Sequence, residues 1–383
     1  MTEVLYCQKI VQDRVYMNIN DGIPKMADED PLVTKVIKIN RDCFEPEEMA
    51  EAAALLRTGR LVAFPTETVY GLGANALDET AAKRIYAAKG RPSDNPLIVH
   101  IAEMSALYDL TEEVPEVAVK LGEKFWPGPL TMILRKSNRV PSGTTGGLQT
   151  VAIRLPADPI ARELIRQSGV YVAAPSANAS GRPSTTTAQH VYEDLSGRID
   201  MIIDGGPVSI GLESTIVDLT GDTPMILRPG YITKEQLETV LGTVVYDKAV
   251  IAKQMQENIV AKAPGMKYRH YAPKGEMVIY EGPQEAVVTA INAEIEKRLA
   301  QSAVVGVLAT DETEQLYVGG HVRSIGSRKD EDSIAAHLYK TLRDFDEIGA
   351  DYIYSESFDD NPLSSAIMNR LRKAAGYHTI TIK

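Results

Sequence analysis

The sequence predicts an α/β protein built on a largely parallel or mixed sheet. Short apolar runs alternate with segments of helical periodicity from residue 33 to residue 242, and a second, shorter series follows after residue 274. The apolar runs end in turns rich in Pro, Gly, Ser and Thr. Because ligands of such sheets usually bind where strands end in loops, the polar turns are the places to look for a site.

The stretch 61–100 shows the pattern most clearly. Residues 61–64 form an apolar run that predicts a buried strand, and the turn 65–73 carries two threonine hydroxyls, a carboxylate and two glycines. A helix is predicted over 79–88, where apolar residues recur at helical spacing. The basic, polar loop 89–96 leads into a second apolar strand, so two polar loops flank one crossover unit.

The other elements follow in chain order. Further strands are predicted in the first series at 33–39, 130–134, 150–155, 170–174 and 201–203, and helices at 47–56, 115–125, 159–167, 187–195 and 233–241. The second series has predicted strands at 277–280, 303–308, 321–325, 352–355 and 379–382, and helices at 285–299, 334–344 and 364–374.

The length of 383 residues exceeds one ordinary core and predicts two domains. We expect an N-terminal extension at 1–32, a first domain at 33–242, a linker at 243–273 and a smaller α/β domain at 274–383. The last domain carries neither a phosphate loop nor a GxGxxG motif, so we assign it no catalytic site.

Composition and charge narrow the function. A net charge of −11 argues against a broad basic face for nucleic acid, although it allows a local basic pocket for a small anion. Cys7 and Cys43 are the two cysteines, without CxxC or zinc spacing, so neither a disulfide framework nor a structural metal is indicated. No signal peptide or membrane span is predicted, and we expect a cytoplasmic protein.

A phosphate or carboxylate site is the main chemical hypothesis. There is no GxSxG elbow and no GxxxxGK[ST] loop. Lys89 and Arg91, however, stand one residue apart in a loop, and Ser176 and Asn178 lie in a polar turn. A lysine point charge beside a forked guanidinium suits phosphate oxygens and the charge that builds up in displacement at phosphorus.

Each of these residues also has a simpler explanation. Lys89 and Arg91 can complement the end of a helix in water, which is the commoner role of a Lys-x-Arg pair. His100 beside an apolar strand is more often a core histidine than a ligand. Arg154 and Arg228, each at the end of an apolar run, add positive charge at the same rim of the sheet or form surface ion pairs worth roughly 0–1 kcal/mol.

Several motifs together carry a resemblance that no single residue does. FPTETVYGLGANA, KGRPSDNPLIVH, FWPGPLT, VAIRLP, APSANASGRPS, GLESTIVD and LRPG occur in this order and closely resemble the YrdC-like family of threonylcarbamoyl-AMP synthases. APGMKYRHYAP and the domain after it are similar to the long, two-domain form, so the resemblance covers about residues 35–383. It implies an open, twisted mixed sheet with a concave, positively charged ligand face and a smaller Rossmann-like C-terminal domain.

The resemblance also implies a reaction. L-threonine, bicarbonate or CO2, and ATP would give threonylcarbamoyl-AMP and pyrophosphate, so the enzyme would be a nucleotidyltransferase. A separate tRNA threonylcarbamoyl transferase system would use the product beside the anticodon, and weak binding of double-stranded RNA is a further partner expectation. Mg2+ would arrive with ATP, held by substrate oxygens and water and not by a protein cage. Glu67 and Glu213 are candidates to hold water or metal.

The motifs assign residues to the two substrates. The threonine pocket implied by the resemblance comprises Thr68, His100, Arg154 and Ser214. The implied nucleotide site comprises Lys89, Arg91, Asn95, Thr150, Ala174, Ser176, Asn178, Arg228 and Tyr271, with Lys89 and Arg91 as the catalytic pair. Tyr271, or with less support Tyr268, would close over the nucleotide, and the segment 266–271 is expected to act as a lid that excludes water.

Two other classes of protein stay open at this stage. One is a nucleic-acid-binding module that uses the concave basic face, although the net charge of −11 makes this the weaker interpretation. The other is a related carbamoyl-adenylate enzyme that acts on carbamoyl phosphate, but the zinc-finger and acylphosphatase segments that usually accompany it are not visible in the sequence. Release of pyrophosphate with and without L-threonine separates these classes from the synthase.

Overall fold

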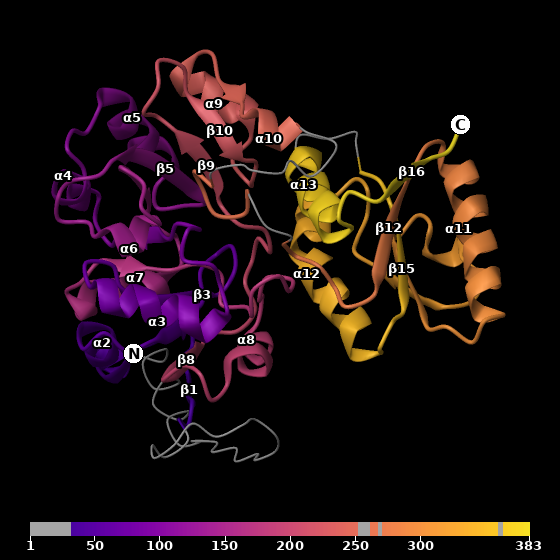
Figure 1. The fold of residues 1–383 in the computed structure, drawn as a ribbon, viewed down its shortest axis with the longest axis horizontal. Coiled ribbons are helices and arrows are strands. Elements are labelled where there is room, and N and C mark those ends of the chain that lie inside the picture. The colour runs from indigo at the N-terminus through magenta and orange to yellow at the C-terminus, as the bar shows by residue number, and fades with distance from the viewer. Residues whose placement is uncertain (1–31, 252–260, 267–269, 359–362) are drawn as a thin grey trace, which may run out of the picture.

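The computed structural model describes residues 32–251, 261–266, 270–358 and 363–383. The first domain occupies the left of Figure 1 and the second the right. The predicted extension, except for Leu32, and the alternative lid residue Tyr268 lie outside the described residues.

The first domain is organised by a mixed sheet with eleven strands within the described residues. Their order is β1-β8-β2-β3-β7-β4-β6-β5-β9-β10-β11. The strands are β1 (Lys35–Lys38), β2 (Val62–Phe64), β3 (Gly71–Asn75), β4 (Ile98–His100), β5 (Leu130–Arg135), β6 (Thr150–Arg154), β7 (Val172–Ala173), β8 (Met201–Asp204), β9 (Thr215–Asp218), β10 (Met225–Arg228) and β11 (Val245–Tyr246).

Helices pack on both faces of this sheet. They are η1 (Pro46–Met49), α2 (Ala50–Arg57), α3 (Glu79–Lys89), η2 (Met104–Ala106), α4 (Leu107–Leu110), α5 (Glu116–Phe125), α6 (Ser142–Thr145), α7 (Pro159–Ser168), α8 (Ala188–Leu195), α9 (Lys234–Leu241) and α10 (Lys248–Ile251). Asp78 begins α3 by accepting from the Thr80 amide, and Gly90 ends it at φ 63°, where a residue without Cβ adopts the left-handed region most readily.

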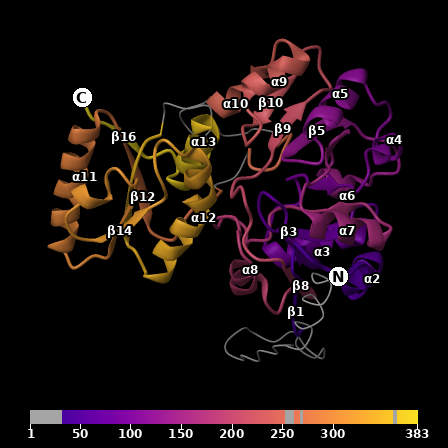
Figure 2. The same ribbon diagram turned by 180° about the vertical axis from the view of Figure 1, so that it is seen from behind.

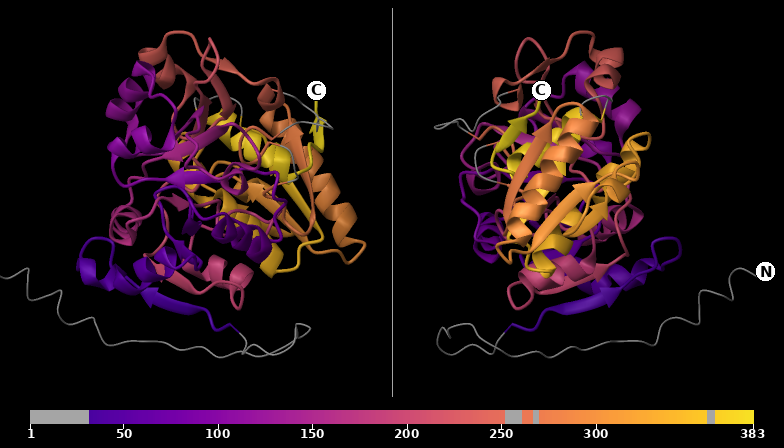
Figure 3. Two further views of the ribbon diagram at one scale, coloured as in Figure 1. Left: turned by 60° about the vertical axis from the view of Figure 1, so that its left-hand side comes forward. Right: turned by 90° about the vertical axis from the view of Figure 1, so that its right-hand side faces the viewer.

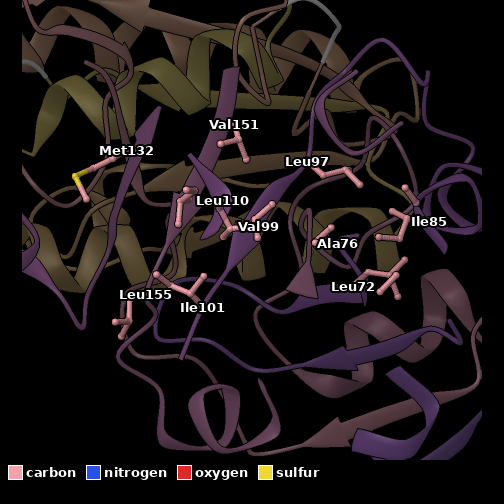
Figure 4. Packing of buried hydrophobic residues seen from close by; sticks show 14 of the residues in the cluster. Leu72, Ala76, Ile85, Leu97, Val99, Ile101, Leu110, Met132, Val151 and Leu155 are labelled. Atoms are coloured by element: carbon pink, nitrogen blue, oxygen red, sulfur yellow. The ribbon is translucent and has the colours of Figure 1, made fainter. Parts of the chain in front are cut away.

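The core of the first domain consists of two large apolar clusters. In one, side chains of β3, β4 and β6 pack against α3, α4 and α5, and Figure 4 shows Leu72, Ile85 and Val99 among them. In the other, α2 and α7 pack over β1, β2 and β8. Burial of these side chains is the main force that holds the sheet in shape.

Strand β3 differs from the sequence prediction. The residues predicted as the end of a turn form β3, which pairs antiparallel with β2 so that Gly73 lies opposite Val62. A Cβ on Gly73 would stand 2.8 Å from atoms of both Phe64 and Val172. The glycine therefore serves close packing inside a sheet and not a turn, and an apolar pattern broken by glycines hides the strand.

The second domain holds a five-stranded, entirely parallel sheet in the order β14-β13-β15-β12-β16. Its elements are β12 (Glu276–Glu281), α11 (Gln284–Leu299), β13 (Val305–Ala309), η3 (Glu314–Leu316), β14 (His321–Ser324), α12 (Glu331–Glu347), β15 (Tyr352–Glu356), α13 (Ser364–Ala374) and β16 (Thr379–Thr381). Helix α11 covers the outer face, as the right panel of Figure 3 shows. The two sheets together confirm the predicted fold class.

Helices α12 and α13 lie between the second sheet and the first domain, and Figures 1 and 2 agree on this from opposite sides. Val69 and Leu212 of the first domain are part of the same buried cluster as the core of these helices. Gly211, at φ 81°, brings its backbone so close to α12 that a Cβ would stand 2.5 Å from the Ala335 oxygen. The two domains thus share a packed interface.

Two other expectations can be compared with the structure. None of the helices among the described residues has the length and apolar character needed to cross a bilayer. Cys43 is disulfide-bonded, although the sequence indicated no disulfide framework. Strand β11 pairs with β10, so the first sheet extends to Tyr246.

We predict that Gly73→Ala lowers the free energy of unfolding by about 1–3 kcal/mol, because the new methyl group overpacks the contact with Phe64 and Val172. Urea unfolding measures the loss. Gly221→Ala is the matched control, since a Cβ there meets nothing within 4 Å. Equal stability of the two variants would contradict the packing role of Gly73.

Candidate active site

Four neighbouring strands of the first sheet place polar side chains on its concave face. Successive side chains of a strand point to opposite faces. Ile98, Ile133, Ala152 and Ile216 belong to one small apolar cluster on this face. The site residues stand two positions from them along the same strands, namely His100 on β4, Thr131 on β5, Arg154 on β6 and Ser214 just before β9.

The register of the sheet brings these side chains into one row. His100 is the parallel partner of Arg154, and Arg154 is the antiparallel partner of Thr131. Thr131 pairs in turn with Ile216, and its hydroxyl lies 2.7 Å from that of Ser214. Residues from four distant motifs therefore meet because β4, β6, β5 and β9 are adjacent.

A cavity lies above this row, and its space counted together with the part open to solvent is about 700 Å3. It is lined by Thr66, Val69, Gly71, Lys89, Arg91, Ile98, His100, Arg154, Ala174, Pro175, Ser176, Asn178, Ser180, Gly181, Arg182, Ser184, Glu213, Ser214, Arg228, Pro264, Gly265, His270 and Tyr271. The cavity is thus bounded by turns of the first domain and by residues of the linker.

Arg154 is the central cation of one end of the cavity. Its Nη1 donates to Oγ1 of Thr68 at 2.9 Å, and its Nη2 lies 2.7 Å from Oε1 of Glu67. The Thr68 hydroxyl is in turn 2.9 Å from that of Thr66, which also donates to the Val69 carbonyl. The PTET turn thereby fixes the orientation of Arg154, which is only 3% exposed.

His100 is a neutral imidazole beside Arg154. Burial, followed by the positive charge of Arg154, lowers its pKa to about 3. Its Nδ1 lies 3.1 Å from the Ile98 carbonyl, and its ring meets Phe64 edge to face at 6.2 Å between centroids. A neutral ring held by a carbonyl can offer a hydrogen bond to a ligand without adding charge.

Arg228 and Ser214 form the next part of the wall. Nε and Nη2 of Arg228 donate to the Ser214 carbonyl at 3.1 and 3.0 Å, and Nη2 also reaches Oγ of Ser214 at 3.1 Å. Burial lowers the pKa of Arg228. The GLEST turn and the LRPG turn are therefore joined by one buried arginine.

Lys89, the last residue of α3, points into the cavity wall opposite. Its ammonium donates to the carbonyls of Ser176 and Asn178 and lies 3.5 Å from Oδ1 of Asn178. Burial, followed by the charge of Arg91, lowers its pKa well below the ordinary value. Lys89 thus holds the Ser176–Asn178 turn and adds positive charge at the same point.

Arg91 stands beside Lys89 in the loop that follows α3. Its Nη2 donates to the carbonyls of Asn95 and Pro96 at 3.3 and 3.1 Å. Burial lowers its pKa to about 10. The loop wraps around its own arginine, so the sequence KGRPSDNP forms a rigid basic corner.

The cavity therefore concentrates positive charge in a protein of net charge −11. Its cations are mostly held by backbone carbonyls, which accept hydrogen bonds without cancelling charge. Buried cations crowded into one hollow raise its affinity for an anion such as a phosphate or carboxylate. The concave, positively charged ligand face expected from the sequence is present.

The structure brings most of the predicted site residues together. Ten of them line the cavity, namely Lys89, Arg91, His100, Arg154, Ala174, Ser176, Asn178, Ser214, Arg228 and Tyr271. Thr68 is fully buried behind Arg154, which it orients. Asn95 and Thr150 are not among the lining residues, because Asn95 is buried in the Arg91 loop and Thr150 begins β6 at its far end.

Several residues that line the cavity were not predicted from the sequence. Ser184 and Arg182 close the APSANASGRPS motif, and His270 precedes Tyr271 in the linker. Their place inside recognised motifs was the available signal. Tyr339 of α12 and Arg370 of α13, which bind Glu213, could not be found in this way, because no recognised motif includes them.

The residues do not form a metal cage. Among the described residues, no cluster of three or more His, Cys, Asp or Glu side chains is placed to bind a metal ion. Glu67 pairs with Arg154, and Glu213 pairs with Arg370 at 3.1 Å while it accepts from Tyr339. Glu213 is therefore occupied by neighbouring donors, whereas Glu67 has the ion pair with Arg154 and its buried carboxylate oxygens accept no hydrogen bond from the described residues.

Fold and cavity together define an α/β protein of the YrdC-like class, with an anion-binding hollow above a mixed sheet. A family model named Sua5_yciO_yrdC and described as "Telomere recombination" matches residues 54–230. A second model, described as "Threonylcarbamoyl-AMP synthase, C-terminal domain", matches residues 232–376.

Full-length relatives agree with both matches. Threonylcarbamoyl-AMP synthase of Pyrococcus abyssi is 49% identical over 91% of this chain and all of its own length (100%). The enzyme of that name from Bacillus subtilis is 52% identical over 87% of this chain and 94% of its own. The crystal structure of P. abyssi Sua5 complexed with L-threonine matches with a TM-score of 0.86 at 48% identity, covering 91% of this chain and 100% of that one. The chain belongs to the threonylcarbamoyl-AMP synthase family in its two-domain form, which confirms the resemblance of the motifs.

The neutral state of His100 predicts a pH dependence of stability. Its folded pKa of about 3 lies below the ordinary 6.5, so the unfolded chain binds a proton that the folded chain refuses. The contribution of neutral His100 to the free energy of unfolding is fully present above pH 6.5 and is lost as the pH falls towards 3.

We therefore expect His100→Gln to flatten this dependence by about 1.4 kcal/mol per pH unit within that window. Urea unfolding of both proteins across a pH series measures the difference. Equal slopes would show that His100 does not stay neutral when the protein folds.

Proposed function

We propose that this chain is an L-threonylcarbamoyladenylate synthase, a nucleotidyltransferase that condenses L-threonine, bicarbonate or CO2, and ATP to threonylcarbamoyl-AMP and pyrophosphate. The observation that carries the proposal is the shared cavity, in which an arginine fork and a basic phosphate corner face one hollow. The identity of about half to synthases over most of the chain supports the same reaction.

The end of the cavity around Arg154 suits the amino acid. A guanidinium whose orientation is fixed by Thr68 can grip the threonine carboxylate. The neutral His100 and the Ser214 hydroxyl can hydrogen-bond its amine and hydroxyl groups. The P. abyssi relative was solved in complex with L-threonine, which supports this assignment.

The end around Lys89 and Arg91 suits the triphosphate. The threonine amine would first combine with CO2 and lose a proton, or combine with bicarbonate and release water, to give an N-carboxy anion. A carboxylate oxygen of this anion attacks the α-phosphorus of ATP while pyrophosphate leaves on the opposite side. No protein nucleophile is needed, because positioning and neutralisation of charge supply the rate. Ser176, Asn178 and Arg228 extend the same wall, and Tyr271 borders it from the linker.

The remaining partners are part of the proposal. Mg2+ enters as part of the Mg·ATP substrate and is held by phosphate oxygens and water. The labile product passes to a tRNA threonylcarbamoyl transferase system, and residence in the cytoplasm follows from that partner. Weak direct binding of RNA stays a prediction.

The deciding experiment measures pyrophosphate release from Mg·ATP and bicarbonate with and without L-threonine, together with mass detection of threonylcarbamoyl-AMP. Threonine-dependent release supports the proposal. Release that requires carbamoyl phosphate would identify the related carbamoyl-adenylate enzyme. Salt-dependent RNA affinity without ATP turnover would identify the nucleic-acid module.

We predict that Lys89→Ala or Arg91→Ala lowers threonine-dependent pyrophosphate release by about 100-fold or more while the protein stays folded, because the charge on the transferring phosphoryl group is no longer offset. Lys83→Ala is the control, since Lys83 lies on the same helix with a 70% exposed side chain. Near-normal release by the Lys89 and Arg91 variants would refute their assignment.

We predict that Arg154→Lys raises KM for L-threonine by about 30-fold and changes KM for ATP much less, because an ammonium cannot replace the planar fork on a carboxylate. Steady-state kinetics with each substrate varied in turn measures both constants. Comparable increases for threonine and ATP would show that Arg154 serves the whole cavity and not the amino acid alone.

A further inference from the structure

One carboxylate of the cavity wall, that of Glu213, is hydrogen-bonded to side chains of the second domain. Glu213 precedes the threonine-site residue Ser214 and is 5% exposed. It accepts hydrogen bonds from Ser184 of the first domain at 2.5 Å and from the Tyr339 hydroxyl of α12 at 2.9 Å. Burial alone would raise the pKa of Glu213, but the charges of Arg370 and Arg228 lower it, so the group is an anion.

Arg370 of α13 joins the two turns that carry Ser214 and Arg228. Its Nε donates to Oε2 of Glu213 at 3.1 Å, its Nη2 to the Glu213 carbonyl at 3.3 Å, and its Nη1 to the Pro229 carbonyl. The side chain is completely buried. All three nitrogens of the guanidinium are therefore committed to the backbone and carboxylate beside the site.

These two turns also press directly on each other. A Cβ on Gly230 would stand 2.5 Å from the Thr215 nitrogen and 2.6 Å from the Glu213 oxygen. Any shift of one turn must therefore move the other. The guanidinium of Arg370 bonds to both turns at this point.

Tyr339 connects the same network to the linker. Its ring stacks on that of Tyr271 at 5.3 Å between centroids with 30° between the planes. The guanidinium of Arg370 also lies 5.9 Å from the centre of the Tyr271 ring. Tyr271 lines the cavity and is expected to border the nucleotide. Its ring therefore packs against the second domain on one side and faces the cavity on the other.

We infer that Arg370 and Tyr339 of the second domain are positioning residues for both substrates, acting through Glu213 on Ser214 and Arg228 and by stacking on Tyr271. This inference rests on the proposed function and assigns the second domain a part in the site beyond structural support. Neither residue is among those that line the cavity, so neither is a catalytic residue.

A matched pair of tyrosine variants tests the inference. Tyr339→Phe removes the hydroxyl bonded to Glu213 and keeps the ring that stacks on Tyr271. Tyr317→Phe removes an equivalent hydroxyl bonded at 2.6 Å to the buried Glu356, away from the domain interface. Both variants lose one hydrogen bond to a buried carboxylate, so both should lose comparable thermal stability.

The kinetic constants should separate the two variants. For Tyr339→Phe we expect KM for threonine and for ATP to rise by about tenfold, the size of effect given by one hydrogen bond to a charged group. For Tyr317→Phe we expect both constants to match the parent. Arg370→Lys keeps the charge and loses the fork across the two turns, so its KM values should rise at least as far as those of Tyr339→Phe.

The outcomes are distinct. Raised KM values in Tyr339→Phe with parent-like values in Tyr317→Phe support the positioning role, even if Arg370→Lys fails to fold. Equal constants in the two tyrosine variants, or a change in kcat alone, would overturn it. Absence of threonine-dependent pyrophosphate release from the parent protein itself would instead contradict the proposed function.

Discussion

The structure depends on buried positive charge whose hydrogen bonds are made to backbone carbonyls. Lys89, Arg91 and Arg228 donate to carbonyl oxygens of turns near the cavity. A carbonyl satisfies a donor but carries no net charge, so the cost of burying each cation is reduced without neutralising it. The hollow thus stays electropositive and the donors are already oriented when an anion arrives.

The same interactions explain why turns rather than sheets carry the chemistry. Two of the cations bind the backbone of a loop or turn: Arg91 donates to the 89–96 loop, and Arg228 donates to the turn at Ser214. The sheet contributes register, because it sets His100 beside Arg154. The strands therefore set the positions of the turns, and hydrogen bonds from the buried cations hold the conformation of these turns.

Much of this arrangement could be predicted from the sequence, and the failures have physical causes. The alternation of elements gave both sheets, and ordered motifs named ten of the cavity residues. β3 was missed because Gly73 meets a packing demand that leaves no apolar signal. Tyr339 and Arg370 were missed because a contact between domains depends on tertiary packing, and neither residue stands in a motif.

The close approach of Gly211 to α12 has a consequence for protein engineering. Its backbone meets the Ala335 carbonyl so tightly that no side chain fits, and the match extends over surfaces from both domains. A chimaera that took its N-terminal half from one homologue and its C-terminal half from another would keep each sheet but combine unmatched faces. A hybrid will keep the packed interface between its domains only if the surfaces on both sides of that interface come from the same homologue.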